Sequence, residues 1–213
     1  MTTSFLQRVI VEQVIKETDT AFSFVLRPVD WVPDHKAGQF ITLVFGEKRR
    51  SYSLISQPGD PFLKITIKRV ANGEFSRKLI DHTLPGDEWI TAGISGYFVL
   101  PDQLNEHEHF FFVAAGSGIT PVLALTEYLL GHQPSKRITL LYSNNSTAST
   151  LFKQRLESLQ EAHPQLTIEW LYSNRFSVRH GRLSNHLLQI LLKTYITNID
   201  TTLFYLGGPF DYM

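Results

Sequence analysis

The segment from Phe110 to Pro121 constrains the fold most, because an unbroken apolar run leads directly into a glycine turn and then a helical pattern. The apolar run, Phe-Phe-Phe-Val-Ala-Ala, is typical of a strand that is buried on both faces. Gly116 and Gly118 form the turn, and Pro121 falls in the first turn of the expected helix. A strand, a glycine turn and a helix in this order predict a parallel α/β sheet with bare backbone N–H groups at the turn.

The two halves of the chain carry different patterns, and the change comes near residue 105. After it, apolar strand candidates at 110–115, 138–142, 167–172 and 203–206 alternate with helical patterns at 119–131, 150–163 and 183–194. Before it, short runs rich in β-branched and aromatic residues at 9–11, 21–26, 39–45, 52–55, 63–67 and 88–91 are separated by Gly and Pro turns. The first half is therefore predicted to be an antiparallel barrel and the second a set of βαβ units.

Composition excludes several classes of function. Lys and Arg together number 20, as do Asp and Glu, so no net charge draws the chain toward nucleic acid or an anionic membrane. With no cysteine among the 213 residues, these residues hold no disulfide, cysteine-bound zinc or cysteine-bound iron–sulfur cluster. The opening residues resemble neither a signal peptide nor a membrane span, which makes the cytoplasm the expected location. His107 and His109 lie in an acidic stretch that we interpret as a linker, and we predict no metal site.

Two motifs in the first half favour a flavin. Arg50-Ser51-Tyr52-Ser53 offers a cation for a phosphate, an aromatic face for the ring system and a hydroxyl for a ring nitrogen. In a strand, Arg50 and Tyr52 share one face and Ser53 points to the other. Gly73-Glu74-Phe75-Ser76 opens a short helix, which suits a pyrophosphate. Each motif alone also fits an ordinary strand end or helix start, but their order and spacing favour the flavin.

The glycine turn at Gly116 favours a pyridine dinucleotide. Gly116 and Gly118 let the backbone approach a pyrophosphate, and Thr120 supplies a hydroxyl where a nicotinamide could lie. Pro121 stands where the common Gly-x-Gly-x-x-Gly pattern has its last glycine, and a tight turn without a ligand remains the alternative.

Taken together, these motifs resemble the ferredoxin reductase family of flavoenzymes over essentially the whole chain, most of all the reductase components of bacterial oxygenases of the phenylacetyl-CoA type. The resemblance rests on Arg50 to Ser53, Gly73 to Ser76, Gly93 to Phe98, Gly116 to Pro121, Tyr142 to Asn144, Gly181 to Leu183 and Gly207 to Pro209, in the family order. It implies a Greek-key FAD-binding barrel over residues 1–104 and a Rossmann-like NAD(P)-binding domain over residues 105–213, which we expect to be truncated at its C-terminus.

The resemblance also implies the chemistry: hydride transfer from NADPH or NADH to FAD, then release of single electrons to an iron–sulfur domain or a ferredoxin-like acceptor. FAD is preferred to FMN because the Gly73 loop suits a pyrophosphate, although a single phosphate could occupy part of it. The residues implied to hold the flavin are Arg50, Tyr52, Ser53, Ile67, Lys68, Gly73, Phe75 and Ser76. Those implied to hold the pyridine nucleotide are Gly116, Gly118, Thr120, Pro121, Ser143, Ser173, Arg175, Gly208 and Pro209. Those implied to act in hydride transfer are Tyr52, Ser53, Thr120 and Gly207.

Three departures from the family pattern leave an alternative open. Gly207 stands where the family usually has Cys, and Asn145 where it commonly has Arg. The Ser-Arg pair that often contacts a 2′-phosphate is interrupted, as Ser173-Asn174-Arg175. Arg175, Arg179 or Arg182 could still pair with a 2′-phosphate, which favours NADPH over NADH. The missing thiol favours the alternative, a non-catalytic subunit that binds flavin or nucleotide for electron relay or sensing.

Overall fold

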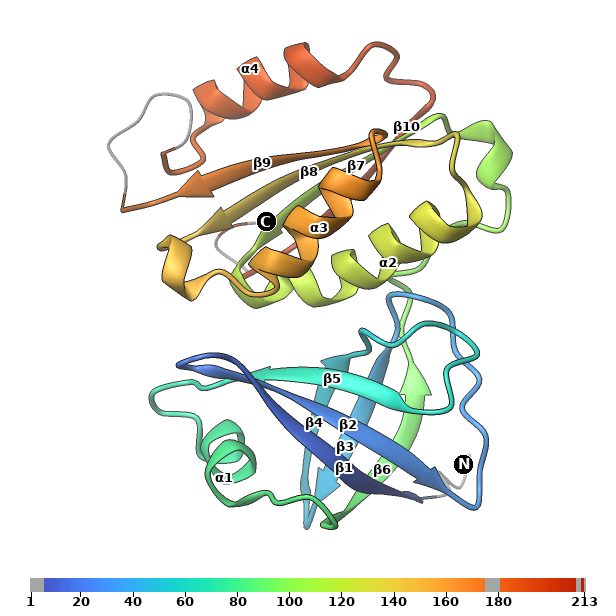
Figure 1. Cartoon of the computed structure of the whole chain (residues 1–213), viewed down its shortest axis with the longest axis vertical. Coiled ribbons are helices and arrows are strands. Elements are labelled where there is room, and N and C mark those ends of the chain that lie inside the picture. The colour runs from blue at the N-terminus through green and yellow to red at the C-terminus, as the bar shows by residue number, and fades with distance from the viewer. Residues whose placement is uncertain (1–5, 175–180, 210–211, 213) are drawn as a thin grey trace. The chain divides into compact units, whose positions relative to one another are not determined.

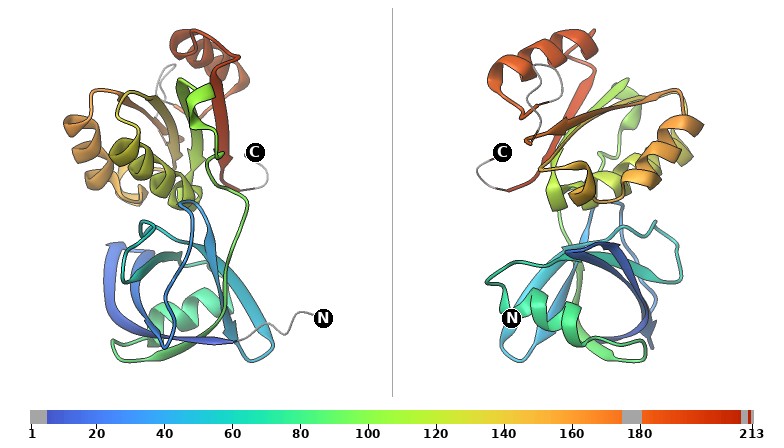
Figure 2. Two further views of the ribbon diagram at one scale, coloured as in Figure 1. Left: turned by 90° about the vertical axis from the view of Figure 1, so that its right-hand side faces the viewer. Right: turned by 60° about the vertical axis from the view of Figure 1, so that its left-hand side comes forward.

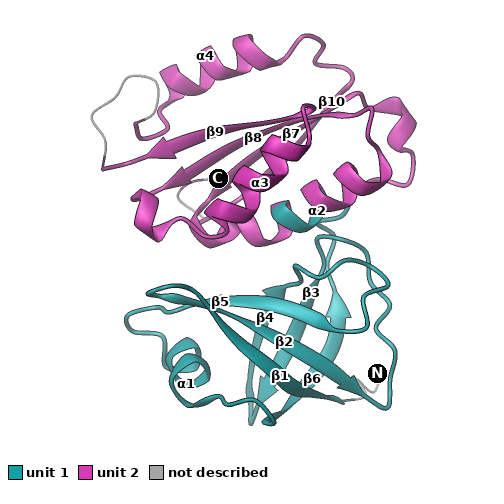
Figure 3. Ribbon diagram, viewed as in Figure 1, with its two compact units in different colours: residues 1–100, 123–125 teal, residues 101–122, 126–213 magenta. Residues whose placement is uncertain are grey.

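A computed structural model gives the structure of residues 6–174, 181–209 and Tyr212 (Figure 1). They form two compact units, residues 1–100 with 123–125 and residues 101–122 with 126–213 (Figure 3). Across the described part of the chain, no helix has both the length and the apolar character needed to cross a membrane.

The first unit is an antiparallel sheet of six strands in the order β4-β3-β6-β1-β2-β5. The strands are β1 (Gln7–Thr18), β2 (Ala21–Val29), β3 (Phe40–Phe45), β4 (Lys48–Ser53), β5 (Leu63–Lys68) and β6 (Glu88–Ser95). β6 returns to pair with both β1 and β3, which gives the Greek-key order. A single helix, α1 (Glu74–His82), connects β5 to β6.

The six strands curl round, as Figure 2 shows, and enclose one apolar core. Side chains alternate between the two faces of each strand, so every second residue enters this core. α1 adds Leu79 to it. The buried side chains are Val9, Val11, Phe24, Leu26, Ile41, Leu43, Leu54, Leu63, Ile65, Ile67, Leu79 and Trp89.

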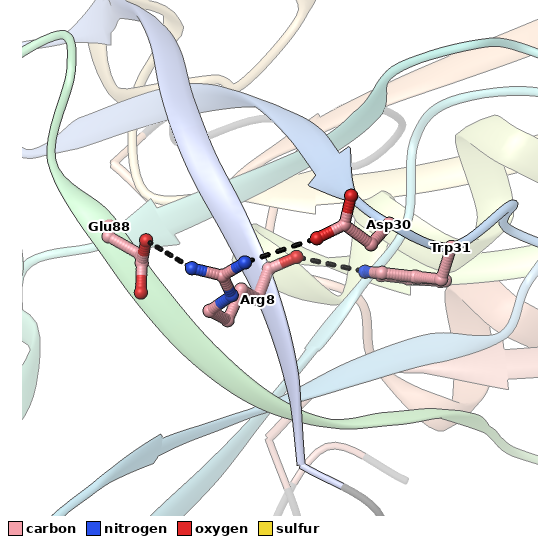
Figure 4. Close-up of polar contacts among 4 residues, drawn as sticks. All are labelled: Arg8, Asp30, Trp31 and Glu88. Carbon is pink, nitrogen blue, oxygen red and sulfur yellow. Dashed lines mark hydrogen bonds and ion pairs between the residues drawn. The ribbon is translucent and has the colours of Figure 1, made fainter.

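A polar cluster around Arg8 ties three segments of the first unit together (Figure 4). The Arg8 guanidinium donates to Asp30 at 3.1 Å and to Glu88 at 3.4 Å, and the Trp31 indole N–H donates to the Arg8 carbonyl at 2.9 Å. Asp30 directly follows β2 with a φ of 63°, in the left-handed region. Since these ion pairs are solvent-exposed, each contributes at most about 1 kcal/mol.

The curled sheet is barrel-like but not closed. Its outermost strands, β4 and β5, are joined at the single bridge between Leu54 and Ile65, where the Ile55 N–H donates to the Lys64 carbonyl at 2.8 Å. No ladder between β4 and β5 extends beyond this point in the described residues. The two strand edges that face each other there are therefore left without a backbone partner strand.

The second unit is a parallel sheet of four strands in the order β10-β7-β8-β9. The strands are β7 (His109–Ala115), β8 (Arg137–Asn144), β9 (Leu166–Tyr172) and β10 (Thr202–Gly207). The helices are α2 (Ile119–His132), α3 (Lys153–Ala162) and α4 (Asn185–Tyr195), with short 3-10 turns η1 (Leu104–Glu106), η2 (Gly116–Gly118) and η3 (Thr147–Ser149). α2 and α3 cover one face and α4 covers the other (Figure 1). Every residue of β7 is consequently buried.

The predicted fold class, an antiparallel barrel-like domain followed by a parallel α/β domain, is confirmed. Each predicted strand and helix is present, with shifts of a few residues at its ends and β1 much longer than the predicted run 9–11. Some strand ends, such as residues 92–95 of β6, were not predicted from the sequence pattern. In the structure they belong to the strand because the end of β6 pairs with residues of the neighbouring β3.

His109 is buried at the start of β7, and it makes the free energy of unfolding depend on pH. One ring nitrogen, Nε2, lies 2.9 Å from the Thr139 hydroxyl, and the side chain is fully buried. Burial, aided by the nearby charge of Arg137, lowers the pKa of His109 from 6.5 to about 4. The folded protein therefore holds this ring neutral where the unfolded chain would already bind a proton.

We predict that the free energy of unfolding falls as the pH is lowered from 6.5 toward 4, by at most about 3 kcal/mol from this group. The sign follows because the unfolded state binds more protons in this window. Urea unfolding of His109→Gln between pH 7 and pH 4.5 should show a reduced slope against pH. The matched substitution at the exposed His186 should leave the slope unchanged. Equal slopes for wild type and His109→Gln would contradict the prediction.

Candidate functional site

The predicted flavin residues of β4 lie on alternate faces of the strand, as expected. Arg50 and Tyr52 pair with Leu43 and Ile41, which are both fully buried, so their side chains lie on the core side of the sheet. Ser53 lies on the opposite face, and the structure keeps its side chain half-buried.

Phe75 joins Arg50 and Tyr52, although it comes from the separate motif that opens α1. The Tyr52 and Phe75 rings stack with centroids 6.5 Å apart and planes inclined by 24°. The Arg50 guanidinium carbon lies 5.7 Å from the Phe75 ring centroid. Two predicted motifs more than 20 residues apart thus form one aromatic platform with a cation at its rim.

Burial raises the pKa of Tyr52 to about 12, and the positive charge of Arg50 only partly opposes this shift. The phenol is therefore neutral at physiological pH, with a flat ring and a hydroxyl that can donate. Such a group can lie against a neutral aromatic ring system without adding charge to it.

The unpaired edges of β4 and β5 add backbone groups beside this platform. Antiparallel neighbours exchange hydrogen bonds at every second residue. The Leu54 N–H donates to the Gln39 carbonyl, which assigns the even residues of β4 to β3 and turns the backbone of Ser53 to the open edge. The Arg69 N–H donates to the Thr20 carbonyl, which in the same way turns the backbone of Lys68 to the open edge of β5.

Ile67 and Lys68 are both predicted from the resemblance to contact a flavin, but only one of them has its backbone groups at the open edge. The Ile67 side chain lies in the core and its backbone belongs to the ladder with β2. Lys68 presents its backbone N–H and C=O at the open edge, where a planar ligand with donors and acceptors could pair with them. That both residues contact a flavin stays a prediction.

The turn before α1 requires glycine at position 73. A Cβ there would lie 2.8 Å from both the Ser76 Oγ and the Val70 Cβ. The Ser76 hydroxyl accepts from the Val70 N–H at 3.1 Å and donates to the Gly73 carbonyl at 3.1 Å. Ser76 thus holds the turn, and the first N–H groups of α1, which have no acceptor within the helix, are the donors left for an anion.

In the second unit, the glycine turn lies against the end of β10. A Cβ at Gly118 would lie 2.3 Å from the Gly207 carbonyl carbon and oxygen, and a Cβ at Gly207 would lie 2.6 Å from the Gly118 carbonyl oxygen. Only two glycines allow this backbone contact. It lies where the strand order reverses, between β7 and β10, which is the position at which open α/β sheets bind ligands.

Gly116 and Thr120 complete this turn. Gly116 has a φ of +52°, in the left-handed region that favours glycine. The Thr120 hydroxyl is buried and donates to the Ser117 carbonyl at 2.9 Å, so it stabilises the entry into α2. A contact between Thr120 and a nicotinamide stays a prediction, as does one with Pro121.

The remaining predicted nucleotide residues lie at the ends of β8, β9 and β10. The Ser143 and Tyr212 hydroxyl oxygens are 2.7 Å apart, and the Tyr212 ring lies beside Gly208. Tyr212 also donates its N–H to the Pro209 carbonyl at 2.9 Å. Tyr212 was not predicted from sequence, because nothing in the pattern shows that the chain folds back onto β8.

Ser173 lies beside Asn145 at the ends of β9 and β8. The Ser173 N–H donates to the Asn144 carbonyl at 2.9 Å, and its hydroxyl donates to the Asn145 side-chain oxygen at 3.3 Å. Two of the positions that depart from the family pattern are therefore neighbours. Arg175, which was predicted to contact a 2′-phosphate, lies outside the described residues, as does Arg179, whereas Arg182 is described and exposed.

Comparison with known proteins agrees with this geometry. A model of the family described as the oxidoreductase NAD-binding domain matches residues 112–213. One component of the 1,2-phenylacetyl-CoA epoxidase of Escherichia coli is 30% identical over 191 residues, which cover 85% of this chain and 53% of that protein. The ferredoxin reductase component of the 3-ketosteroid-9-alpha-monooxygenase of Mycobacterium tuberculosis is 36% identical over 180 residues, which cover 76% of this chain and 49% of that protein.

Residues 112–213 thus form a ferredoxin reductase-like NAD-binding domain, and the chain as a whole is similar to these reductase components. Among solved structures, a ferredoxin NADP+ reductase from Neisseria gonorrhoeae with bound FAD and NADP has a TM-score of 0.81 at 21% identity, covering 97% of this chain and 86% of that one. At this identity the likeness concerns the fold alone. The ferredoxin reductase-like chain spans about half the length of the two curated relatives named above.

Replacing either glycine of the turn, Gly116 or Gly118, by alanine should destabilise the protein, but for a different reason in each case. Gly118→Ala should lower the free energy of unfolding by roughly 1–3 kcal/mol, because its Cβ meets backbone atoms of β10. Gly116→Ala should cost about 1–2 kcal/mol, because its Cβ meets nothing within 4 Å but its backbone is left-handed. Urea unfolding measures both.

Gly131→Ala in α2 is the matched control, since a Cβ there also meets nothing within 4 Å. It should stabilise the protein by up to about 1 kcal/mol, the difference in helix propensity. If Gly118→Ala were as harmless as Gly131→Ala, the backbone contact with β10 would not be required.

Proposed function

We propose that this chain is the flavin and pyridine-nucleotide part of an oxidoreductase that takes a hydride from NAD(P)H onto FAD and then delivers single electrons to an iron–sulfur acceptor. The observation that carries the proposal is the Arg50–Tyr52–Phe75 platform beside the open edges of β4 and β5, because it gathers residues from two separate motifs. The relatives, which are named as parts of an epoxidase and a monooxygenase, support the same function.

The residues of the first unit fit FAD. The platform offers a neutral aromatic face, Arg50 a cation, and Lys68 and Ser53 backbone groups at an open edge. The turn at Gly73 leaves the first N–H groups of α1 for a pyrophosphate, which favours FAD over FMN. FAD would supply the redox chemistry, since it accepts a hydride and can release electrons singly.

The residues of the second unit fit a dinucleotide. A Cβ at Gly116 would meet nothing within 4 Å, so its absence leaves space at the end of β7 for a diphosphate to approach the backbone, while Gly118 serves the contact with Gly207. Gly208 and Pro209 would lie beneath the nicotinamide, and Ser173 near the adenosine ribose. We propose NADPH as the preferred donor, and parallel assays with NADPH and NADH at equal concentrations test that choice.

The chain's own part in the reaction is to bind and orient. No side-chain acid or base has to move a proton for a hydride to pass between two rings, so the protein contributes stacking, position and exclusion of water. The acceptor would hold its iron–sulfur cluster outside these 213 residues, because they contain no cysteine. We place the protein in the cytoplasm.

A second function, binding of flavin and nucleotide without turnover, is favoured by Gly207. The family usually has a thiol there, beside the nicotinamide, and this chain lacks it. The hypothesis that its loss slows hydride transfer is tested with Gly207→Cys, in which unaltered rates would count against it. Because a Cβ at this position lies 2.6 Å from the Gly118 oxygen, the same variant needs a stability measurement beside the kinetics.

Anaerobic reduction separates the two functions. We expect the purified chain, loaded with FAD, to lose its visible flavin absorbance when NADPH or NADH is added without oxygen. Stopped-flow absorbance gives the rate. A chain that binds flavin and nucleotide but keeps its absorbance would be a binding subunit, and a chain that binds no flavin at all would refute the proposal.

Arg50→Ala should weaken FAD binding at least about tenfold, because a charge-assisted contact with a phosphate is lost. Fluorescence titration of the apoprotein with FAD measures this. Arg49→Ala is the matched control: it removes the same charge from the neighbouring position of β4, whose side chain lies on the other face. Equal weakening by both variants would show a general charge effect and no contact specific to Arg50.

A further inference from the structure

Tyr142 is fully buried in the middle of the second unit, yet its hydroxyl reaches two backbone carbonyls. It lies 3.1 Å from the Gly116 oxygen and 3.4 Å from the Leu151 oxygen, so one phenolic proton serves both. The first carbonyl belongs to the glycine turn and the second to the segment before α3. Burial raises the pKa of Tyr142 well above its usual range, which keeps the phenol protonated and able to donate.

Both carbonyls belong to segments with left-handed backbone conformations. Gly116 has a φ of +52°, and Phe152, which follows Leu151, has a φ of 56°. A bulky residue adopts the left-handed region only where its surroundings hold it there. The Tyr142 hydroxyl is thus bonded beside two positions where the backbone is left-handed, one of which, Phe152, is unfavourable for its residue type.

The ring of Tyr142 is itself held firmly. β8 lies between β7 and β9, where Tyr142 pairs with Ala114 on one side and Trp170 on the other. The Trp170 ring lies 5.9 Å from the Tyr142 ring, and the Lys153 ammonium lies 5.5 Å from the Trp170 centroid. The hydroxyl therefore has a fixed position from which to orient Gly116.

We propose that Tyr142 is a positioning residue for the pyridine nucleotide: its hydroxyl fixes the Gly116 carbonyl and so orients the N–H groups of the following turn toward the diphosphate. This inference rests on the proposed function. Tyr142 need not touch the nucleotide, since it acts through the peptide group of Gly116. A residue that contacts the 2′-phosphate would change the preference between NADPH and NADH, whereas Tyr142 should change the affinity for both alike.

The test is Tyr142→Phe, which keeps the ring and removes the hydroxyl. We expect the Kd of NADP+, measured by calorimetry, to rise about fivefold to tenfold, as the loss of one buried hydrogen bond predicts. The KM for NADPH should rise with it, while kcat at saturation and the FAD content stay within twofold. Amide hydrogen exchange in residues 117–119 should become faster.

Tyr195→Phe is the matched control, because it removes a phenol that donates to Glu169 on the α4 side of the same sheet. It should lower stability without changing the Kd of NADP+ or the exchange of residues 117–119. An unchanged Kd in Tyr142→Phe, or an equal rise in Tyr195→Phe, would overturn the inference. If wild type itself bound neither NADP+ nor NAD+, the proposed function would fail first, and the inference with it.

Should Tyr142→Phe not fold, 3-fluorotyrosine at position 142 gives the second measurement. It keeps the ring and the hydroxyl and makes the hydroxyl a stronger donor. The Kd of NADP+ should then be no higher than in wild type. A higher Kd would show that donation from this hydroxyl does not support nucleotide binding, and the inference would be wrong.

Discussion

The backbone contact between Gly118 and Gly207 is the constraint on which the second unit depends. An open α/β sheet binds its ligand where the strand order reverses, and here the glycine turn after β7 and the end of β10 meet at that point through their backbones. Each glycine removes a Cβ that would otherwise lie within 2.6 Å of the other's backbone. Glycine at position 207 therefore has a structural role in this contact, in addition to replacing the cysteine that the family usually has there.

The first unit creates its candidate site by the opposite means, through a gap in pairing. β4 and β5 meet at one bridge, and the rest of their facing edges forms no ladder in the described residues. Such edges present backbone N–H and C=O groups with which another strand or a ligand can pair. The residues predicted to hold a flavin gather beside this gap. A planar ligand with donors and acceptors along its rim would satisfy the edges that the sheet leaves open.

The sequence predicted the elements and the faces of the strands well, because both follow from local periodicity. Alternation alone placed Arg50 and Tyr52 on one face of β4, and the family motif assigned Phe75 to the same predicted site as Tyr52, on which it stacks. What could not be predicted depends on contacts between distant segments. The Ser76 and Thr120 hydroxyls bond to backbone in their own turns, and Tyr142 and Tyr212 reach turns and strand ends that no spacing reveals.

These hydroxyl contacts help to explain why proteins of low sequence identity share this fold. In both candidate sites side-chain hydroxyls hold turns in shape, and in the second unit the groups left for a ligand are mostly backbone N–H and C=O. Backbone groups are present whatever the side chain, so their arrangement depends on a few glycines and on the residues that fix their turns. Relatives at 36% identity and fold neighbours at 21% can then differ over most of the surface, because little of it takes part in this geometry. In the second unit, substitutions that move the glycine turn should therefore affect nucleotide binding more than substitutions that alter an exposed side chain beside that turn.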